Sequence, residues 1–347
     1  MKEITVVLVA EIKLEFGRKP RIFKSFSSKK MPIIETKKIN KDFIKSEYNI
    51  RQPFKLVKSV KPAVRDLDVS IEAGELVGFL GPNGAGKTTF LKIISGIIHP
   101  TSGEAKVLGF VPWERNYKFL RKISLVMGQK NQLWWDLPAI DSFKLLKEVY
   151  DIPKKTYERN LETMMGVLDM HNLVRGRLRN MSLGERMKCE LTACFLHDPK
   201  VIFLDEPTIG LDVTTAQSIR KFIQTINREK KCTIVLTSHY MGDIEALCKR
   251  VIMINNGEKI YDGDFTALIN KYAPERIIKV TLSSPEEKKI FSKIKYKKEM
   301  IEGQGVIRAK KEDIGQLAEQ VFDKFDPDKI SITEPDAEEV IAKIYRQ

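Results

Sequence analysis

The hydrophobic pattern of the chain predicts buried strands that alternate with amphipathic helices. Runs that are apolar at nearly every position occur at 76–80, 201–204 and 232–237. A strand that is apolar on both faces is typical of a sheet covered by helices on each side. Apolar residues at helical spacing follow the first run and precede the second, at Phe90, Leu91, Ile93, Ile94, Leu183, Met187, Leu191, Cys194 and Phe195. The pattern predicts an α/β fold.

The pattern changes in residues 275–347. Here the predicted order is strand, helix, strand, strand, helix, strand, followed by a last helix. The first six of these elements have the order of a ferredoxin-like α+β unit. We expect a small accessory domain that regulates the chain or supports dimerisation; the alternative is a passive appendage.

Length and hydropathy give no candidate for a membrane span. None of the apolar runs approaches the roughly 18 to 20 residues that a spanning helix needs, so we expect a chain that is soluble on its own. Residues 1–31 are basic and without periodicity, which indicates a flexible extension or a start at Met31 instead of Met1. The four cysteines form no CxxC pair and lie in apolar segments, as reduced thiols of a cytoplasmic protein do.

The formal net charge of +14 has two interpretations. It could attract nucleic acid or anionic lipid. Because Lys and Arg are scattered over the whole chain and alternate with Glu on helix faces, a solvated surface is the favoured interpretation. We expect no nucleic-acid partner.

The segment GPNGAGKTT lies between a predicted strand and a predicted helix, which is the context of a phosphate-binding loop. Glycine lets backbone amides approach phosphate oxygens. Lys87 is expected to reach the β- and γ-phosphates, and the Thr88 hydroxyl is placed for Mg²⁺. The predicted nucleotide-binding residues of this loop are Gly81, Pro82, Asn83, Gly84, Ala85, Gly86, Lys87, Thr88 and Thr89.

Two adjacent carboxylates follow the strand at 201–204. A carboxylate there loses solvation unless a cation or a substrate compensates it. We expect Asp205 to orient Mg²⁺ and its waters, and Glu206 to be the general base for the attacking water. The alternative for Glu206 is a cap of the turn at Pro207. His239 ends another buried strand, where it could sense the γ-phosphate.

A second anion site is predicted at the start of a helix, where Ser182 occupies the N-cap position and Gly184 follows. One nucleotide in the first loop does not need two such sites. We therefore expect Ser182 and Gly184 to serve a second copy of the chain.

These motifs, in this order, resemble the ATP-binding subunit of ABC transporters of the export type. GPNGAGKTT resembles Walker A, VIFLDE Walker B, GLD at 210–212 the D-loop and SHYM the switch histidine, and Gln129 stands where the family has its Q-loop glutamine. The resemblance covers roughly residues 35–270. It implies ATP and Mg²⁺ as cofactors, catalytic Glu206, His239 and Gln129, metal contacts from Thr88, Gln129 and Asp205, and a nucleotide contact from Asp212.

The resemblance also implies an architecture. Residues 32–272 would form the ATP-binding domain, with a RecA-like core, an antiparallel β edge and a helical subdomain at about 130–185. In the β edge, HPTSGEAKVLGF predicts a hairpin around Gly103. Phe43 stands in the family's adenine-stacking position, although Tyr48 and Phe54 could stack as well.

One motif departs from the family pattern. The usual signature LSGGQ here reads MSLGE, in which Ser182 and Gly184 persist and Glu185 replaces Gln. A carboxylate next to an anion would weaken closure around the nucleotide.

The implied partners are a second copy of the ATPase and a separate membrane permease at the inner face of the cell membrane. Trp134, Trp135 and Leu137 are large apolar residues in a predicted loop, where they either dock the permease or pack locally. The alternative function is a soluble ABC ATPase that acts on nucleic acid or the ribosome. Such proteins carry long insertions or two nucleotide domains, and this sequence has neither. The sequence does not name a cargo.

Overall fold

The computed structural model describes residues 32–49, 52–128, 131–273, 275–301, 303–310 and 312–346, and gives no side-chain detail for 45–49 and 52–58. The expectations for residues 1–31, Gln129, Tyr48 and Phe54 therefore lie outside what is described. Among the helices of the described part, none combines the length and the hydropathy that crossing a bilayer requires.

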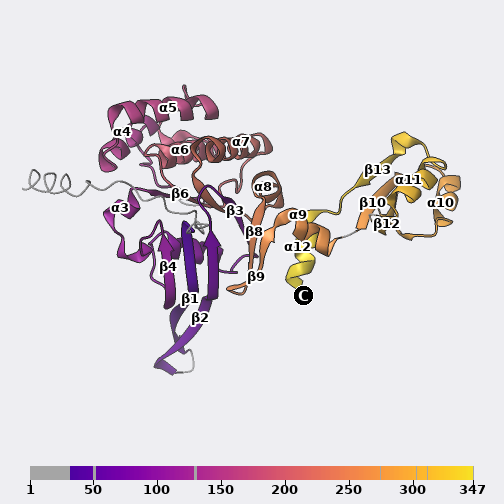
Figure 1. The fold of residues 1–347 in the computed structure, drawn as a ribbon, viewed down its shortest axis with the longest axis horizontal. Helices are drawn as coiled ribbons and strands as arrows, with labels where there is room; N and C mark the ends of the chain where they lie inside the picture. The colour runs from indigo at the N-terminus through magenta and orange to yellow at the C-terminus, as the bar shows by residue number, and fades with distance from the viewer. Residues whose placement is uncertain are drawn as a thin grey trace, which may run out of the picture. The chain divides into compact units, whose positions relative to one another are not determined.

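A six-stranded sheet forms the centre of the ATP-binding region (Figure 1). Its order is β5-β6-β7-β3-β8-β9, with only β9 antiparallel to its neighbour. The strands are β5 (Ile123–Met127), β6 (Val201–Asp205), β7 (Thr233–Thr237), β3 (Leu76–Leu80), β8 (Arg250–Asn255) and β9 (Glu258–Asp264). Because the first five run parallel, their carboxyl ends share one edge, which is where ligands bind in such sheets.

The side chains of each central strand alternate between two cores. Val201 and Phe203 of β6 belong to the core that includes helix α2 (Lys87–Ile94). Ile202 and Leu204 belong to the opposite core, which includes residues of α6 (Leu183–Phe195), α7 (Val213–Lys230) and α8 (Met241–Leu247). This alternation explains why the strands are apolar at nearly every position.

A three-stranded antiparallel sheet borders the first core, with β1 (Ile34–Asn49) between β2 (Gln52–Ile71) and β4 (Ser102–Val107). The predicted hairpin around Gly103 is wrong. Gly103 lies inside β4, which pairs with β1 instead of with its own continuation. A Cβ at this position would stand 2.2 Å from the Lys38 carbonyl oxygen. The glycine therefore allows β1 to approach β4 closely and does not form a turn.

The helical subdomain contains α4 (Ala139–Val149) and α5 (Lys154–Leu168), which lie above α6 and α7 in Figure 1. Tyr157, Leu161, Met164 and Leu168 repeat every three or four residues along α5 and join the second core. Periodicity of this kind places one face of the helix against its neighbours. The subdomain limits of about 130–185 stay a prediction.

A third sheet in the described residues has the order β11-β12-β10-β13 and is antiparallel throughout. Its strands are β10 (Glu275–Thr281), β11 (Lys297–Ile301), β12 (Gln304–Lys310) and β13 (Ile330–Thr333), and α10 (Pro285–Ser292) and α11 (Ile314–Phe322) connect them. The ferredoxin-like topology is confirmed. This sheet and its two helices share a core of their own, whereas Ala337, Val340 and Ile341 of α12 (Ala337–Arg346) belong to the core of the ATP-binding region.

Candidate active site

The loop between β3 and α2 has the backbone geometry of an anion cradle. Gly84 and Gly86 have φ angles of 82° and 105°, which L-residues with a Cβ rarely adopt. A Cβ on Gly86 would stand 2.2 Å from the Ala63 carbonyl oxygen, while nothing lies within 4 Å of that position at Gly84. The loop is therefore closely packed at its base and open at its tip.

Lys87 is the first residue of α2, and its side chain curls back into the loop. Its Nζ donates hydrogen bonds to the carbonyl oxygens of Gly81 at 2.5 Å and Pro82 at 3.2 Å. Burial lowers the pKa of Lys87, an effect that the nearby carboxylates of Glu206 and Asp205 partly oppose. The ammonium group lies at the loop, where a phosphate group would meet it.

Asp205, at the end of β6, joins three elements. The Thr88 hydroxyl of α2 lies 2.8 and 3.1 Å from its two carboxylate oxygens. The Thr237 hydroxyl, at the end of β7, donates to Asp205 Oδ1 at 2.6 Å. A hydroxyl and a carboxylate at the cradle are oxygen ligands of the kind that Mg²⁺ takes, directly or through water, so these residues fit the metal.

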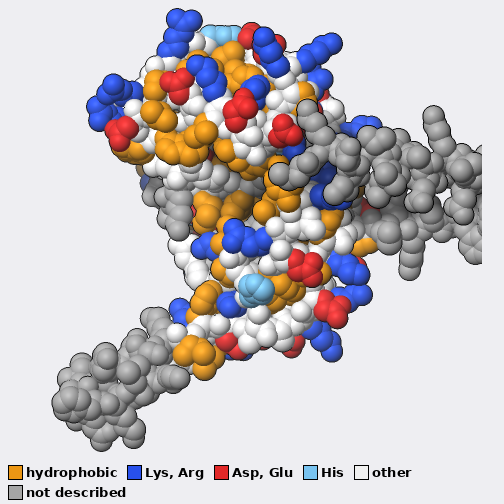
Figure 2. Space-filling view, turned by 90° about the vertical axis from the view of Figure 1, so that its left-hand side faces the viewer, with side chains coloured by type: hydrophobic (Ala, Val, Ile, Leu, Met, Phe, Trp, Pro, Cys, Tyr) orange, Lys and Arg blue, Asp and Glu red, His pale blue; other side chains and the backbone are white. Residues whose placement is uncertain are grey.

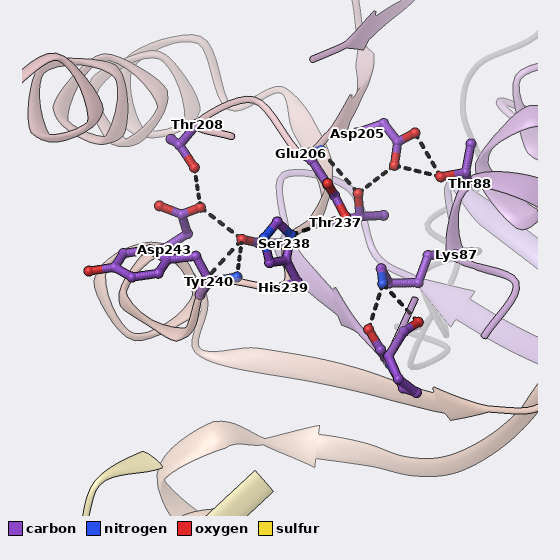
Figure 3. A network of polar contacts seen from close by, with 12 residues as sticks. Lys87, Thr88, Asp205, Glu206, Thr208, Thr237, Ser238, His239, Tyr240 and Asp243 are labelled. Carbon is purple, nitrogen blue, oxygen red and sulfur yellow. Dashed lines mark hydrogen bonds and ion pairs between the residues drawn. The ribbon is translucent and has the colours of Figure 1, made fainter. Parts of the chain in front are cut away.

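Glu206 directly follows β6 and faces the switch histidine (Figure 3). Its Oε1 lies 3.3 Å from His239 Nδ1. Its φ angle is 53°, in the left-handed region, and its N–H donates to the carbonyl oxygen and hydroxyl of Thr237, each at 3.1 Å. A carboxylate held in an uncommon backbone conformation by a neighbouring strand is typical of a functional position.

A cavity of about 350 Å³ extends from Glu206 and the glycine loop to Phe43. Such a volume lies within the range of small-molecule sites. The Phe43 ring is 42% exposed, and Lys41 Nζ lies 5.4 Å from its centroid. The cavity is lined by Phe43, Lys61, Pro62, Ala63, Pro82, Asn83, Gly84, Ala85, Gly86, Lys87, Thr88, Thr89 and Glu206. Phe43 and the loop thus line one cavity, and the stacking of Phe43 on adenine stays a prediction.

Ser182 is the N-cap of α6, and Glu185 completes a capping box. The Ser182 N–H donates to Glu185 Oε2 at 2.8 Å, and the Glu185 N–H donates to Ser182 Oγ at 3.3 Å. In this arrangement the Glu185 carboxylate accepts a hydrogen bond from the backbone at the start of the helix. The Glu that replaces the Gln of the LSGGQ pattern therefore has a local structural role, as part of the helix cap.

Asp212 is the N-cap of α7, where it accepts the Thr215 N–H at 2.9 Å and the Thr214 hydroxyl at 2.5 Å. These bonds hold the pKa of Asp212 well below its usual range. A Cβ on Gly184 would stand 2.7 Å from the Thr215 methyl group, so α6 and α7 start side by side. Ser182, Gly184 and Asp212 do not line the loop cavity.

Two residues that the sequence reasoning missed also belong to this region. Thr237 forms hydrogen bonds with both Asp205 and Glu206. Lys61 of β2 pairs with Phe43 of β1 and lines the same cavity. The signal for Thr237 was its place directly before SHYM at the end of a strand. No local signal marks Lys61, because a 17-residue segment separates it from Phe43 in the sequence.

Comparisons with known proteins agree with this geometry. The sequence matches the family model described as ABC transporter over residues 64–209. It is 37% identical over 219 residues to the ABC transporter ATP-binding protein NatA of Bacillus subtilis, covering 63% of this chain and 87% of that protein. It is 30% identical over 227 residues to the linearmycin resistance ATP-binding protein LnrL of the same organism, covering 65% and 72%.

A solved structure shares the fold. It is the dimeric, post-hydrolysis state of an ATP-binding cassette bound to ADP and Pi, with a TM-score of 0.58, 22% identity, and coverage of 67% of this chain and 98% of that one. The chain belongs to the family of ABC transporter ATP-binding proteins. It is an ATPase subunit that uses ATP with Mg²⁺ and works with a second cassette and a membrane permease.

Proposed function

We propose that this chain powers an exporter: two copies close around two ATP molecules and drive a separate permease. The observation that carries the proposal is the Glu206 carboxylate, which lies 3.3 Å from His239 and lines the same cavity as Lys87 and Thr88. A base and a polar partner at the mouth of a phosphate cradle are the parts that hydrolysis of a terminal phosphate needs.

Each residue of the cradle has a proposed role. The backbone N–H groups of residues 83–89 and the Lys87 ammonium bind the phosphates. Thr88 and Asp205 would hold Mg²⁺, with Gln129 contributing from the Q-loop position. The metal, when bound, neutralises charge that develops on the phosphate oxygens. Thr237 orients the Asp205 carboxylate through its 2.6 Å hydrogen bond.

Glu206 and His239 act on the attacking water and the γ-phosphate. Glu206 accepts the proton of the water or orients it, while His239 contacts the γ-phosphate and keeps the carboxylate in place. Glu206 is only 18% exposed at its side chain, so little water competes for it. Phe43 stacks on the adenine, since its exposed ring forms part of the same cavity.

The second copy completes the site. Ser182, Gly184 and Asp212 do not line the cavity of their own chain, so we assign Ser182 and Gly184 to the nucleotide of the partner copy and Asp212 to the interface. Moving such a pair from almost open to almost closed takes about 5.5 kcal/mol of differential binding. Charge-assisted contacts to two γ-phosphates can supply it, and hydrolysis removes them.

The permease would dock on the helical subdomain. Trp134, Trp135 and Leu137 are 44%, 41% and 39% exposed. The Arg186 guanidinium lies 4.9 Å from the Trp135 ring centroid, which holds that ring in place. Figure 2 shows hydrophobic side chains among charged side chains of both signs over the upper part of one face, where α4 and α5 lie. Such a surface fits the cytoplasmic helix of a membrane protein, which would place the chain at the inner face of the membrane.

Export is favoured over import because one of the relatives is named for linearmycin resistance. We propose that the ferredoxin-like unit at 275–333, together with α12, regulates the ATPase or supports the dimer.

Co-purification tests the proposed function. The Glu206→Gln variant is tagged, held closed with Mg-ATP, and recovered from detergent-solubilised native membranes, with Lys87→Ala as the control that cannot close. We expect a polytopic membrane protein in stoichiometric amount with the first variant only. Recovery of ribosomal or nucleic-acid-bound material instead would contradict the transporter role.

A further inference from the structure

Asp243, near the start of α8, is a fully buried carboxylate (Figure 3). It lies beside two loops, the one that carries Glu206 after β6 and the one that carries His239 after β7, which we call the catalytic loops. Its Oδ2 accepts a hydrogen bond from the Thr208 hydroxyl and another from the Ser238 hydroxyl at 2.8 Å. Its Oδ1 accepts the Arg220 Nε–H of α7 at 2.7 Å. The segment after β6, helix α7 and the segment before α8 therefore meet at one side chain.

The hydroxyl partners of Asp243 flank the proposed catalytic pair. Thr208 lies two residues after Glu206, and Ser238 lies one residue before His239. Ser238 Oγ also accepts the Tyr240 N–H at 3.0 Å, so the hydroxyl of the residue before His239 contacts the backbone of the residue after it. A single carboxylate thus ties the loop of the base to the loop of the histidine.

The chemistry of this cluster argues against a role in packing alone. An apolar residue would fill the same volume without the cost of burying a charge. Here the charge is balanced by Arg220, whose guanidinium is covered in turn by the Tyr240 ring at 5.4 Å. The carboxylate accepts from both catalytic loops at once, which an apolar side chain could not do.

We propose that Asp243 is a positioning residue for ATP hydrolysis, which sets the 3.3 Å separation of Glu206 and His239 through Thr208 and Ser238. The inference rests on the proposed roles of Glu206 and His239. Asp243 does not line the loop cavity, so it acts on turnover through its neighbours and leaves ATP binding unchanged.

Steady-state kinetics of Asp243→Asn in the full chain tests the proposal. We expect kcat to fall at least about tenfold, because small displacements of catalytic groups have large effects on rate, while KM for ATP changes less than about twofold. Thr208→Val and Ser238→Ala each remove one hydroxyl and keep the volume nearly constant. Both variants should also lower kcat, by several-fold. We expect them to remain folded, so they test the proposal even if Asp243→Asn does not fold.

The matched control is Asp262→Asn. Asp262 accepts Arg250 Nε–H at 2.9 Å, a carboxylate–arginine pair of the same kind on β8 and β9, away from the catalytic loops. This variant should keep kcat within about twofold. An equal fall of kcat in Asp262→Asn, or an unchanged kcat in Asp243→Asn, Thr208→Val and Ser238→Ala, would overturn the inference.

A double-mutant cycle separates positioning from general destabilisation. If Asp243 acts through His239, adding Asp243→Asn to His239→Ala should lower kcat by less than about twofold more, since groups that act as a unit are not additive. If the two losses of kcat instead multiply, as independent effects do, the inference is contradicted, while the roles of Glu206 and His239 stay intact. Full turnover by Glu206→Gln would instead contradict the proposed function, and the inference would fall with it.

Discussion

The Thr88 hydroxyl lies 2.8 Å from a carboxylate oxygen of Asp205, a residue 117 positions further along the chain. The contact joins the first turn of α2 to the end of β6, and Thr237 adds the end of β7. Helix and strands therefore bring two hydroxyl groups and a carboxylate together next to the glycine loop.

Asp205→Asn should weaken the response to Mg²⁺. The change keeps the size of the side chain but removes the charge next to Thr88. We expect the Mg²⁺ concentration for half-maximal ATP hydrolysis to rise at least about tenfold, as is usual when a residue that orients a metal shell is lost. Asp136→Asn, which breaks an exposed ion pair with Arg179, is the control. An unchanged Mg²⁺ midpoint would remove Asp205 from the metal site.

Phe43→Ala should weaken ATP binding, and Phe43→Trp should preserve it. Stacking of an aromatic ring on a base is worth about 1 kcal/mol or more, which corresponds to at least about a fivefold rise in Kd. Equilibrium binding of a fluorescent ATP analogue measures this directly. Equal affinity of the Ala variant and the parent would show that Phe43 is only a surface side chain of the cavity.

Glu185→Ala should destabilise the fold more than Glu185→Gln. Glutamine can still accept the Ser182 N–H, whereas alanine leaves the start of α6 without half of its capping box. Loss of a cap costs about 1 kcal/mol, and the Gln variant should stay within about 0.5 kcal/mol of the parent. Urea denaturation compares the three proteins. A Gln variant as unstable as the Ala variant would show that the charge, and not the hydrogen bond, matters.

His197 should make the fold sensitive to acid. Burial lowers its pKa from 6.5 to about 4 in the folded chain, where it contacts the Ile123 carbonyl oxygen and stacks on Tyr150 at 4.0 Å. The unfolded chain therefore binds the proton first as the pH falls. Stability due to this group is present above pH 6.5 and is lost between about pH 6.5 and 4, by at most about 3 kcal/mol.

Unfolding midpoints in urea at pH 7 and pH 5 measure this loss. His197→Phe keeps the stacking but cannot take up a proton, so its midpoint should change less between the two pH values than that of the parent. The same pH dependence in both proteins would assign the effect to other groups.

The sequence predicts the loop between β3 and α2 because local geometry determines it. A glycine loop between a strand and a helix can take few backbone conformations, so the positive φ angles of Gly84 and Gly86 and the place of Lys87 at the start of α2 follow from the order of residues alone. Parallel strands also bring their carboxyl ends to one edge, which explains why Asp205 and His239 were predicted at the same site.

Contacts between distant segments were harder to predict. The sequence around Gly103 is typical of a turn, yet Gly103 lies in β4 because β1 approaches so closely that only glycine fits. The deciding partner is a backbone atom of Lys38, whose position depends on the folded chain. The Glu185 carboxylate, by contrast, accepts the N–H of Ser182 only three residues before it, a local contact that the Ser-x-x-Glu spacing indicates.

Turnover of Mg-ATP by Glu206→Gln is the most direct test of Glu206 as the general base. We expect hydrolysis to fall by at least about a hundredfold. The variant should bind ATP as the parent does and form a stable pair of chains in its presence, measured by light scattering. Hydrolysis at the rate of the parent would contradict the account, because Glu206 would then not be the base that its place beside His239 indicates.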